Sequence, residues 1–145
     1  MKKLITILIM LSILCLMSCS TFEQLINETN DALEFSEEFC LALAYDDIEN
    51  AKEYLHPDWI SQNGNFEDYI LKFEKENKVD FSNGVAIRNR YDGTPTAFTT
   101  EYNGRIYELK IDVVIGNQEL TLYFLIVDNN VGYGIYGFQV HSYDR

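Results

Sequence analysis

A histidine and an aspartate flank a proline at residues 56–58, and a tryptophan follows them. Imidazole and carboxylate groups are the usual general acids and bases of enzymes, because protein environments bring their pKa values near neutral pH. His56 and Asp58 are therefore the first catalytic candidates, and Asp112 offers a second acid. The alternative interpretation is structural: His56 acts as a donor group at a helix end, Asp58 lies in a surface turn and Trp59 packs in the core.

Metal, nucleotide and thiol chemistry have little support in the sequence. Two histidines and one free thiol make a zinc site weak, since structural zinc needs four closely spaced Cys or His ligands. His141 is expected as a surface or half-buried strand residue. The Asp-rich turns lack the calcium-loop pattern, and the glycines at 132, 134 and 137 alternate with aromatic residues as in a closely packed strand. The sequence therefore predicts no metal and no cofactor. Cys40, within an apolar run, is predicted to be a buried, inert thiol.

Tyrosine is the side-chain type that most suggests a binding surface. Its apolar ring and polar hydroxyl suit ligand pockets and interfaces. The candidate binding residues lie in the second half of the chain: Tyr102, Tyr107, Tyr133 and Tyr136. The alternative is that these residues reflect strand propensity and core filling. Arg88 and Arg90 share one face of a neighbouring strand, where they either meet an acidic partner or neutralise nearby carboxylates.

The first eighteen residues predict a secretory signal peptide. Lys2 and Lys3 precede a mostly apolar run over residues 4–17, which is shorter than the roughly 20 residues that cross a bilayer. Residues 16–19 read Leu-Met-Ser-Cys and resemble a bacterial lipobox, although Met17 is bulkier than usual at its position. The resemblance implies that Cys19 receives a diacylglycerol, becomes the new N-terminus, and is acylated on its amine, as by palmitate.

The lipobox resemblance also implies a location. Each buried CH₂ of a lipid contributes roughly 0.8 kcal/mol, so two or three chains hold a domain on a membrane. We expect the protein to be anchored in the cell envelope. Where the cell has an outer membrane, that membrane is the expected site, because residue 20 is Ser and not the Asp of an inner-membrane retention signal. Otherwise the expected site is the outer face of the cell membrane. The alternatives are an ordinary secreted protein with Cys19 as a chance thiol, or an uncleaved anchor.

Composition and charge narrow the function classes. The 145 residues are 47% hydrophobic and 23% charged, with a net charge of −12, which excludes a disordered or collagen-like chain. This acidity repels phosphate backbones, so nucleic acid is not an expected partner. Residues 19–80 hold 16 acidic and 4 basic residues, whereas residues 81–145 hold 7 and 5. The second half is therefore the better contact surface near anionic lipid.

The same boundary separates two hydrophobic periodicities. Apolar residues recur at helical spacing between Ala32 and Leu43, a short second helix begins at Asp46 or Asp47 and ends before Pro57, and a third begins at Asn65. The second half predicts antiparallel strands over residues 85–91, 96–102, 105–115, 119–127 and 131–143, separated by turns rich in Asn, Asp and Gly. Residues 19–145 are expected to form a single domain.

The stretch from Phe39 to Trp59 resembles the first helices of the nuclear transport factor 2-like (cystatin-like) superfamily. A long helix ends in Ala-Leu-Ala-Tyr, an acidic pair follows, and a short helix ends at His-Pro. The resemblance implies an α+β fold, in which a curved antiparallel sheet wraps the N-terminal helices as a cone. It implies no single chemistry, because the superfamily contains isomerases, dehydratases, ligand binders and protein-interaction modules.

Two functional hypotheses follow. The preferred one is a non-enzymatic, membrane-anchored lipoprotein that binds a protein partner or small ligand at the cell envelope. The alternative is a small lyase, isomerase or hydrolase of the same fold that uses His56 with Asp58 or Asp112. An immunity-like protein is a third option that a small acidic chain permits. An open, polar cone would favour chemistry or ligand binding, whereas a cone filled with Phe and Leu would favour partner binding.

Overall fold

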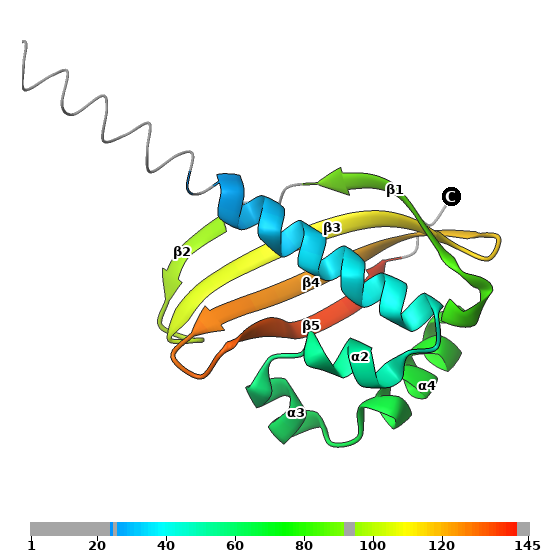
Figure 1. Ribbon diagram of the computed structural model, residues 1–145, viewed down its shortest axis with the longest axis horizontal. Coiled ribbons are helices and arrows are strands. Elements are labelled where there is room, and N and C mark those ends of the chain that lie inside the picture. The colour runs from blue at the N-terminus through cyan, green and yellow to red at the C-terminus, as the bar shows by residue number, and fades with distance from the viewer. Residues whose placement is uncertain (1–23, 25, 92–94, 142–145) are drawn as a thin grey trace, which may run out of the picture.

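The computed structural model describes the backbone of residues 24, 26–91 and 95–141 and most of their side chains. Cys19 with its lipobox, and the Asp-Gly turn at residues 92–93, lie outside the described residues. Helices come first and an antiparallel sheet follows, which confirms the predicted α+β class (Figure 1). Within the described ranges, no helix is long and apolar enough to span a membrane.

The long N-terminal helix, residues 26–44, crosses one face of the sheet in Figure 1. Its buried positions recur every three or four residues, as the sequence predicted for an amphipathic helix. The buried residues are Thr29, Ala32, Leu33, Ser36, Phe39, Cys40, Ala42 and Leu43. The helix ends where Asp46 takes a left-handed φ of 57° and the Asp47 amide donates to the Ala42 carbonyl at 2.9 Å.

Three short helices follow rather than the two predicted. They are α2 (Ile48–Glu53), α3 (Pro57–Asn63) and α4 (Phe66–Asn77). Asp47 and Asn65 cap α2 and α4 as expected. α2 ends at Glu53, before Pro57 as predicted, and Pro57 occupies the first turn of α3, where its missing N–H and fixed φ are favourable. Asp58 therefore belongs to the first turn of a helix and not to a surface turn.

The sheet contains five described strands, β1 (Val85–Tyr91), β2 (Pro95–Thr99), β3 (Gly104–Ile115), β4 (Gln118–Asn129) and β5 (Tyr133–His141). Their order is β1-β3-β4-β5, and β2 pairs with the start of β3. A 3₁₀ turn, η1 (Phe81–Asn83), precedes β1. β2 ends before the predicted boundary because residues 100–103 form the turn into β3, with Asn103 at a φ of 49°.

The core lies between the helices and one face of the sheet. Alternate residues of β3 and β4 point toward the helices, and two of them, Leu109 and Phe124, are only 1% and 2% exposed. Glu108, Lys110 and Tyr123 point to the opposite face, which we call the open face. The wet and dry faces predicted for β3 are therefore confirmed, and the two faces offer different kinds of site.

Candidate functional site

His56 is fully buried, and both of its ring nitrogens have structural partners. Nδ1 accepts a hydrogen bond from the Asp58 amide at 3.1 Å, which makes His56 the N-cap of α3. Because Nδ1 is an acceptor, the hydrogen-bond network assigns the proton to Nε2. That atom lies 3.2 Å from the Asn129 Oδ1 and 3.2 Å from the Gly132 carbonyl oxygen. The expectation of a donor at a helix end is therefore corrected: His56 accepts at a helix start.

The backbone around His56 joins the helices to the edge of β5. The His56 amide donates to the Ile135 carbonyl at 3.0 Å, and the Ile135 amide donates to the Tyr54 carbonyl at 2.8 Å. A Cβ on Gly134 would lie 2.6 Å from the His56 nitrogen, and one on Gly132 would lie 3.0 Å from Pro57 Cδ. Close packing thus explains these two glycines, as the sequence predicted.

Asn129 is a structural residue that sequence reasoning missed. Its Oδ1 accepts from the amides of Val131 and Gly132 at 2.8 and 3.2 Å, while its Nδ2 donates to the Tyr102 carbonyl at 3.0 Å. Asparagine commonly bonds the backbone two residues onward in turns, so the local pattern indicates a turn. Its contacts with His56 and Tyr102 come from distant segments, and only the fold supplies them.

The acids proposed to work with His56 are not assembled around it. An Asp58 oxygen lies 3.8 Å from Nδ1, but that nitrogen already accepts from the backbone. Asp112 lies on the open face and accepts from the Thr121 hydroxyl at 2.7 Å. Along β4, the partner of Asp112 is five residues from the partner of Ile135, or roughly 17 Å. The sequence candidates therefore do not form a catalytic trio.

Aromatic rings fill the space between the helices and the sheet. The Phe138 ring centre lies 4.7 Å from that of Phe73 and 5.2 Å from that of Phe39. The Trp59 ring centre lies 5.0 Å from that of Tyr69, so the predicted core position of Trp59 is confirmed. In the part of the chain that the structure describes, no three His, Cys, Asp or Glu side chains are grouped to hold a metal ion.

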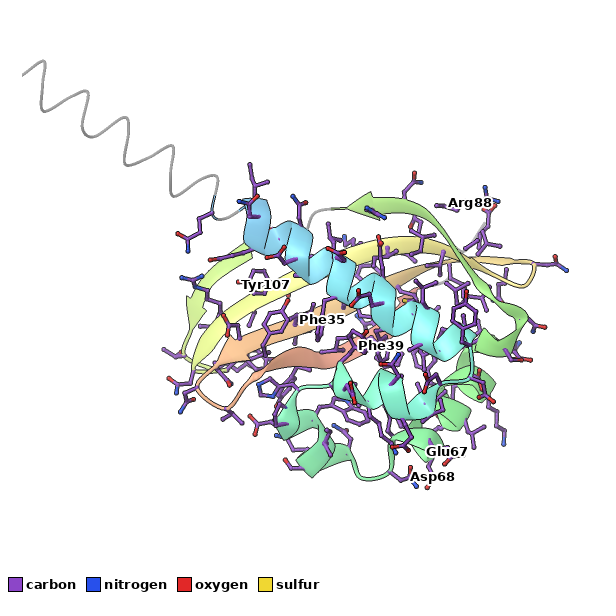
Figure 2. The ribbon with its side chains drawn as sticks, viewed as in Figure 1. Phe35, Phe39, Glu67, Asp68, Arg88 and Tyr107 are labelled. Carbon is purple, nitrogen blue, oxygen red and sulfur yellow. The ribbon has the colours of Figure 1, made fainter. Side chains whose placement is uncertain are left out.

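The four candidate tyrosines gather at one end of the sheet and form two separate groups. On the helix side, Tyr107 is 4% exposed and its hydroxyl lies 3.4 Å from Glu28. Figure 2 shows Tyr107 and Phe35 along the seam between the N-terminal helix and the sheet. Tyr133 packs there too, with its ring centre 5.0 Å from that of Phe35.

The other two tyrosines contact each other. The Tyr102 and Tyr136 ring centres are 5.1 Å apart in an edge-to-face arrangement, and the Tyr136 hydroxyl accepts from Gln62 at 3.2 Å. Burial raises the pKa of Tyr107 and of Tyr133. These two phenols are therefore neutral near physiological pH and suit hydrogen bonding and packing better than proton abstraction.

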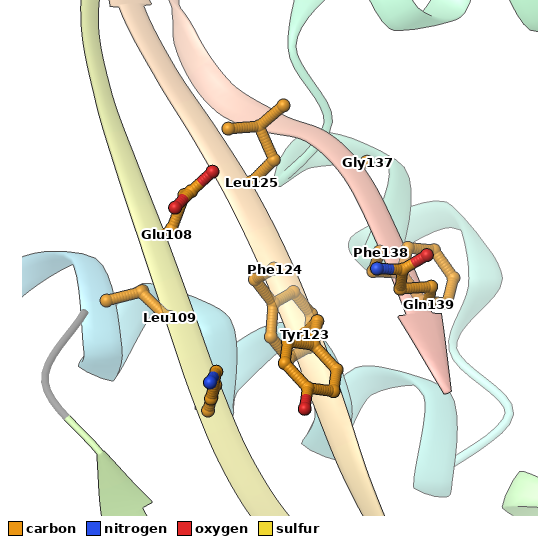
Figure 3. Close-up of a pocket in the computed structure, with 9 residues that line it drawn as sticks. Glu108, Leu109, Tyr123, Phe124, Leu125, Gly137, Phe138 and Gln139 are labelled. Atoms are coloured by element: carbon orange, nitrogen blue, oxygen red, sulfur yellow. The ribbon is translucent and has the colours of Figure 1, made fainter. Parts of the chain in front are cut away.

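The open face carries a hollow of about 480 Å³ (Figure 3). Cross-strand register builds it: Leu125 pairs with Glu108 and Gly137, and Tyr123 pairs with Lys110 and Gln139. A Cβ on Gly137 would meet no atom within 4 Å, so this glycine leaves the floor open. The floor is apolar and the rim is polar. The alternation of polar and apolar residues indicates which side chains share the open face. The hollow itself depends on the register in which the strands pair.

Two arginines of the sheet are paired with glutamates of the N-terminal helix. Arg90 contacts both carboxylate oxygens of Glu37. The Arg105 Nη1 atom lies 2.7 Å from the Glu28 Oε2 atom. Arg90 thus neutralises a carboxylate, one of the two expected roles. Burial, together with the nearby Glu34 charge, raises the pKa of Glu37 although Arg90 acts to lower it. At Glu28, burial acts to raise the pKa, but hydrogen bonds from Gln24 and Arg105 outweigh it and lower the pKa.

Cys40 is the buried thiol that the sequence predicted. It is 0% exposed, and burial with the nearby Glu37 charge raises its pKa to about 12. A thiol with this pKa is protonated at neutral pH and has little nucleophilic character.

Comparison with protein-family models, with curated proteins and with solved structures gives no match for this chain. The fold and the site together describe an α+β module with a filled core, a histidine fixed by structural hydrogen bonds, and a hollow on the open face of its sheet.

Proposed function

We propose that the protein is a lipid-anchored extracytoplasmic lipoprotein that binds a protein partner or small ligand and does not catalyse a reaction. The observation that carries this proposal is the contrast between the two faces of the sheet. Aromatic side chains fill the helix side, whereas the open face presents a hollow with an apolar floor and a polar rim. A partner or ligand can bind at the open face without any rearrangement of the core.

The anchor is proposed from the sequence. The lipobox-like residues 16–19 would be processed at Cys19, and the lipid would hold the domain at the cell envelope. The proposed site is the outer membrane where one exists, and otherwise the outer face of the cell membrane. We also propose that the domain is of the nuclear transport factor 2-like, cystatin-like type. Support comes from the long helix lying across the sheet and from the order of helices before strands.

The hollow has a size that fits binding. Ligand pockets commonly measure about 300–1,000 Å³ and combine apolar walls with a few polar groups. Here Leu125 and Tyr123 provide apolar surface, while Glu108, Lys110 and Gln139 provide charges and hydrogen-bonding groups. Lys110 Nζ lies 5.1 Å from the Tyr123 ring centre, so an incoming aromatic or cationic group would compete for the same ring.

The enzymatic alternative needs a proton-transfer group in contact with substrate. His56 is 0% exposed and both ring nitrogens are in structural bonds, which disfavours it for that role. A His56→Asn variant that folds, but loses a cellular activity that Gly137→Trp retains, would favour the enzyme hypothesis.

The anchor is tested by metabolic labelling with an alkyne fatty acid and by detergent-phase partitioning. We expect the wild-type chain and Cys40→Ala to incorporate the label and to enter the detergent phase. Cys19→Ala should do neither, because it lacks the acceptor thiol. Unlabelled, freely diffusing wild-type protein would overturn the lipoprotein proposal.

Recognition is tested with a photo-crosslinking amino acid at residue 125 in living cells. We expect a discrete adduct that disappears in a Gly137→Trp background, because the indole fills the hollow. The same probe at Leu71, which is exposed on α4, is the matched control and should give no such adduct. Adducts that are insensitive to Gly137→Trp would contradict binding at the hollow.

A further inference from the structure

One end of the molecule combines the start of the N-terminal helix with the turns that precede β3 and follow β4. Figure 1 shows the helix start, β2 and the β4–β5 turn at this same end. A chain of contacts links them: Glu28 is 2.7 Å from Arg105, Arg105 pairs with Asp128, and Asp128 pairs with Tyr133. We call this region the anchor end and define it by Ile26, Tyr102, Val131 and Tyr133.

We infer that the anchor end is a membrane-contacting surface that rests among the lipid headgroups of the bilayer holding Cys19. The inference depends on the proposed lipid anchor and extends it from a tether to an orientation. Five residue steps separate Cys19 from Gln24, so the lipidated residue and the helix start lie at most about 18 Å apart. The helix over residues 26–44 is about 28 Å long, which makes its start the near side of the domain.

Exposed apolar groups at the anchor end suit this contact. Ile26 is 45% exposed, Val131 50% and Tyr133 38%. Single exposed apolar residues are ordinary, but here they come from three elements and lie at the end closest to the tether. Tyrosine favours the headgroup level, where its ring and hydroxyl meet different surroundings. Glu101, beside Tyr102, opposes deeper insertion, so the contact stays in the headgroup layer.

The far end of the molecule carries the charge that opposes the reverse orientation. Outside the α3 segment, which contacts the β4–β5 turn, residues 45–53 and 64–80 hold 9 acidic and 4 basic residues. Leu71 is 60% exposed there, but the hollow that it lines is also lined by four acidic residues, Asp46, Glu67, Glu74 and Asp80. Anionic headgroups would repel this end. The anchor end also carries Glu101 and Asp128, but the carboxylate of Glu28 there is paired with Arg105.

The orientation is tested on full-length lipidated protein in vesicles of phosphatidylethanolamine with a minor share of phosphatidylglycerol. The environment-sensitive fluorophore NBD is attached at Val131→Cys or, as the matched control, at Leu71→Cys. Native Cys40 stays unlabelled because it is 0% exposed. We expect the probe at residue 131 to shift to the blue and to lose about half or more of its emission to spin-labelled lipid, with no change at residue 71.

Three other outcomes would each contradict one part of the proposal: the contact surface, the orientation or the anchor. Protein that floats with the vesicles while the probe at residue 131 stays water-like contradicts the membrane-contacting surface and leaves the anchor intact. Quenching at residue 71 that equals or exceeds that at 131 contradicts the orientation. Protein that does not float and carries no lipid removes the anchor itself. Ile26→Cys supplies an independent probe on the helix if Val131→Cys lowers the urea midpoint of unfolding.

Discussion

The backbone of His56 lies so close to Gly134 that a Cβ at residue 134 would come within 2.6 Å of the His56 nitrogen. The contact allows the segment between α2 and α3 to bond to β5, through a parallel bridge between Leu55 and Ile135. β5 is the last strand of the sheet order, and exposed edge strands promote pairing with other chains. The helical segment therefore covers part of an edge that would otherwise be open.

Gly134→Ala should destabilise the protein by at least about 1–3 kcal/mol, because the added methyl group meets backbone atoms that cannot move independently. Gly137→Ala is the matched control on the same strand, since its added methyl group meets nothing within 4 Å. We expect that control to stay within about 1 kcal/mol of the wild type. Urea unfolding followed by circular dichroism measures both. Equal loss in the two variants would contradict the close approach.

His56→Ala should cost about 1–3 kcal/mol, because it removes the α3 cap and the Nε2 donor that faces the half-buried Asn129 Oδ1 and Gly132 carbonyl oxygen. His56→Asn should cost less, since asparagine is a good N-cap but does not reach the β4–β5 turn. The free energies of unfolding of both variants decide the matter. A stable His56→Ala variant would show that these hydrogen bonds contribute little.

Glu28→Gln and Glu37→Gln should have opposite effects on the pH dependence of stability. The pKa of Glu28 is lowered in the folded state, so its carboxylate stabilises the protein above about pH 4.3 and loses that effect as pH falls through the folded pKa. The pKa of Glu37 is raised by burial, so its ionised form destabilises the protein at neutral pH, and acid relieves this.

Near pH 7, Glu28→Gln should therefore lose about 0.5 kcal/mol, while Glu37→Gln should match or exceed the wild type. Both differences should shrink at a pH well below the folded-state pKa of each carboxyl group, where both groups are protonated. Chemical unfolding at the two pH values checks the signs. Greater loss in Glu37→Gln at neutral pH would mean that the Arg90 pair outweighs burial.

Cys40 should resist thiol reagents in the folded protein and react fully after denaturation, because it is buried and its pKa is raised to about 12. Val131→Cys provides a reactive control, since residue 131 is 50% exposed. Colorimetric thiol titration of the lipidated chain counts the reactive groups. Rapid reaction of Cys40 without denaturant would indicate frequent local opening of the N-terminal helix.

Much of the fold could be predicted from the sequence because the relevant signals are local. The apolar spacing from Ala32 to Leu43 indicated the buried helix face, and β1 has the predicted bounds, 85–91. Asp47 and Asn65 were recognisable as caps. The sequence did not predict α3, because a proline after a helix indicates that the helix has ended. That Pro57 also begins a new helix depends on the cap formed by His56.

Some features of the candidate site likewise follow from local sequence, and others depend on the tertiary structure. The sequence alone determined the residue types available for chemistry, the acidic helical half, the alternation of β3 and the burial of Cys40, since these follow from composition and periodicity. Tertiary structure decided that His56 bonds to Asn129, that Asp112 lies far from it, and that Gly137 opens a hollow. The His56–Asn129 contact, for example, joins residues 73 positions apart. Their geometry is set by strand register and helix docking, which no single segment encodes.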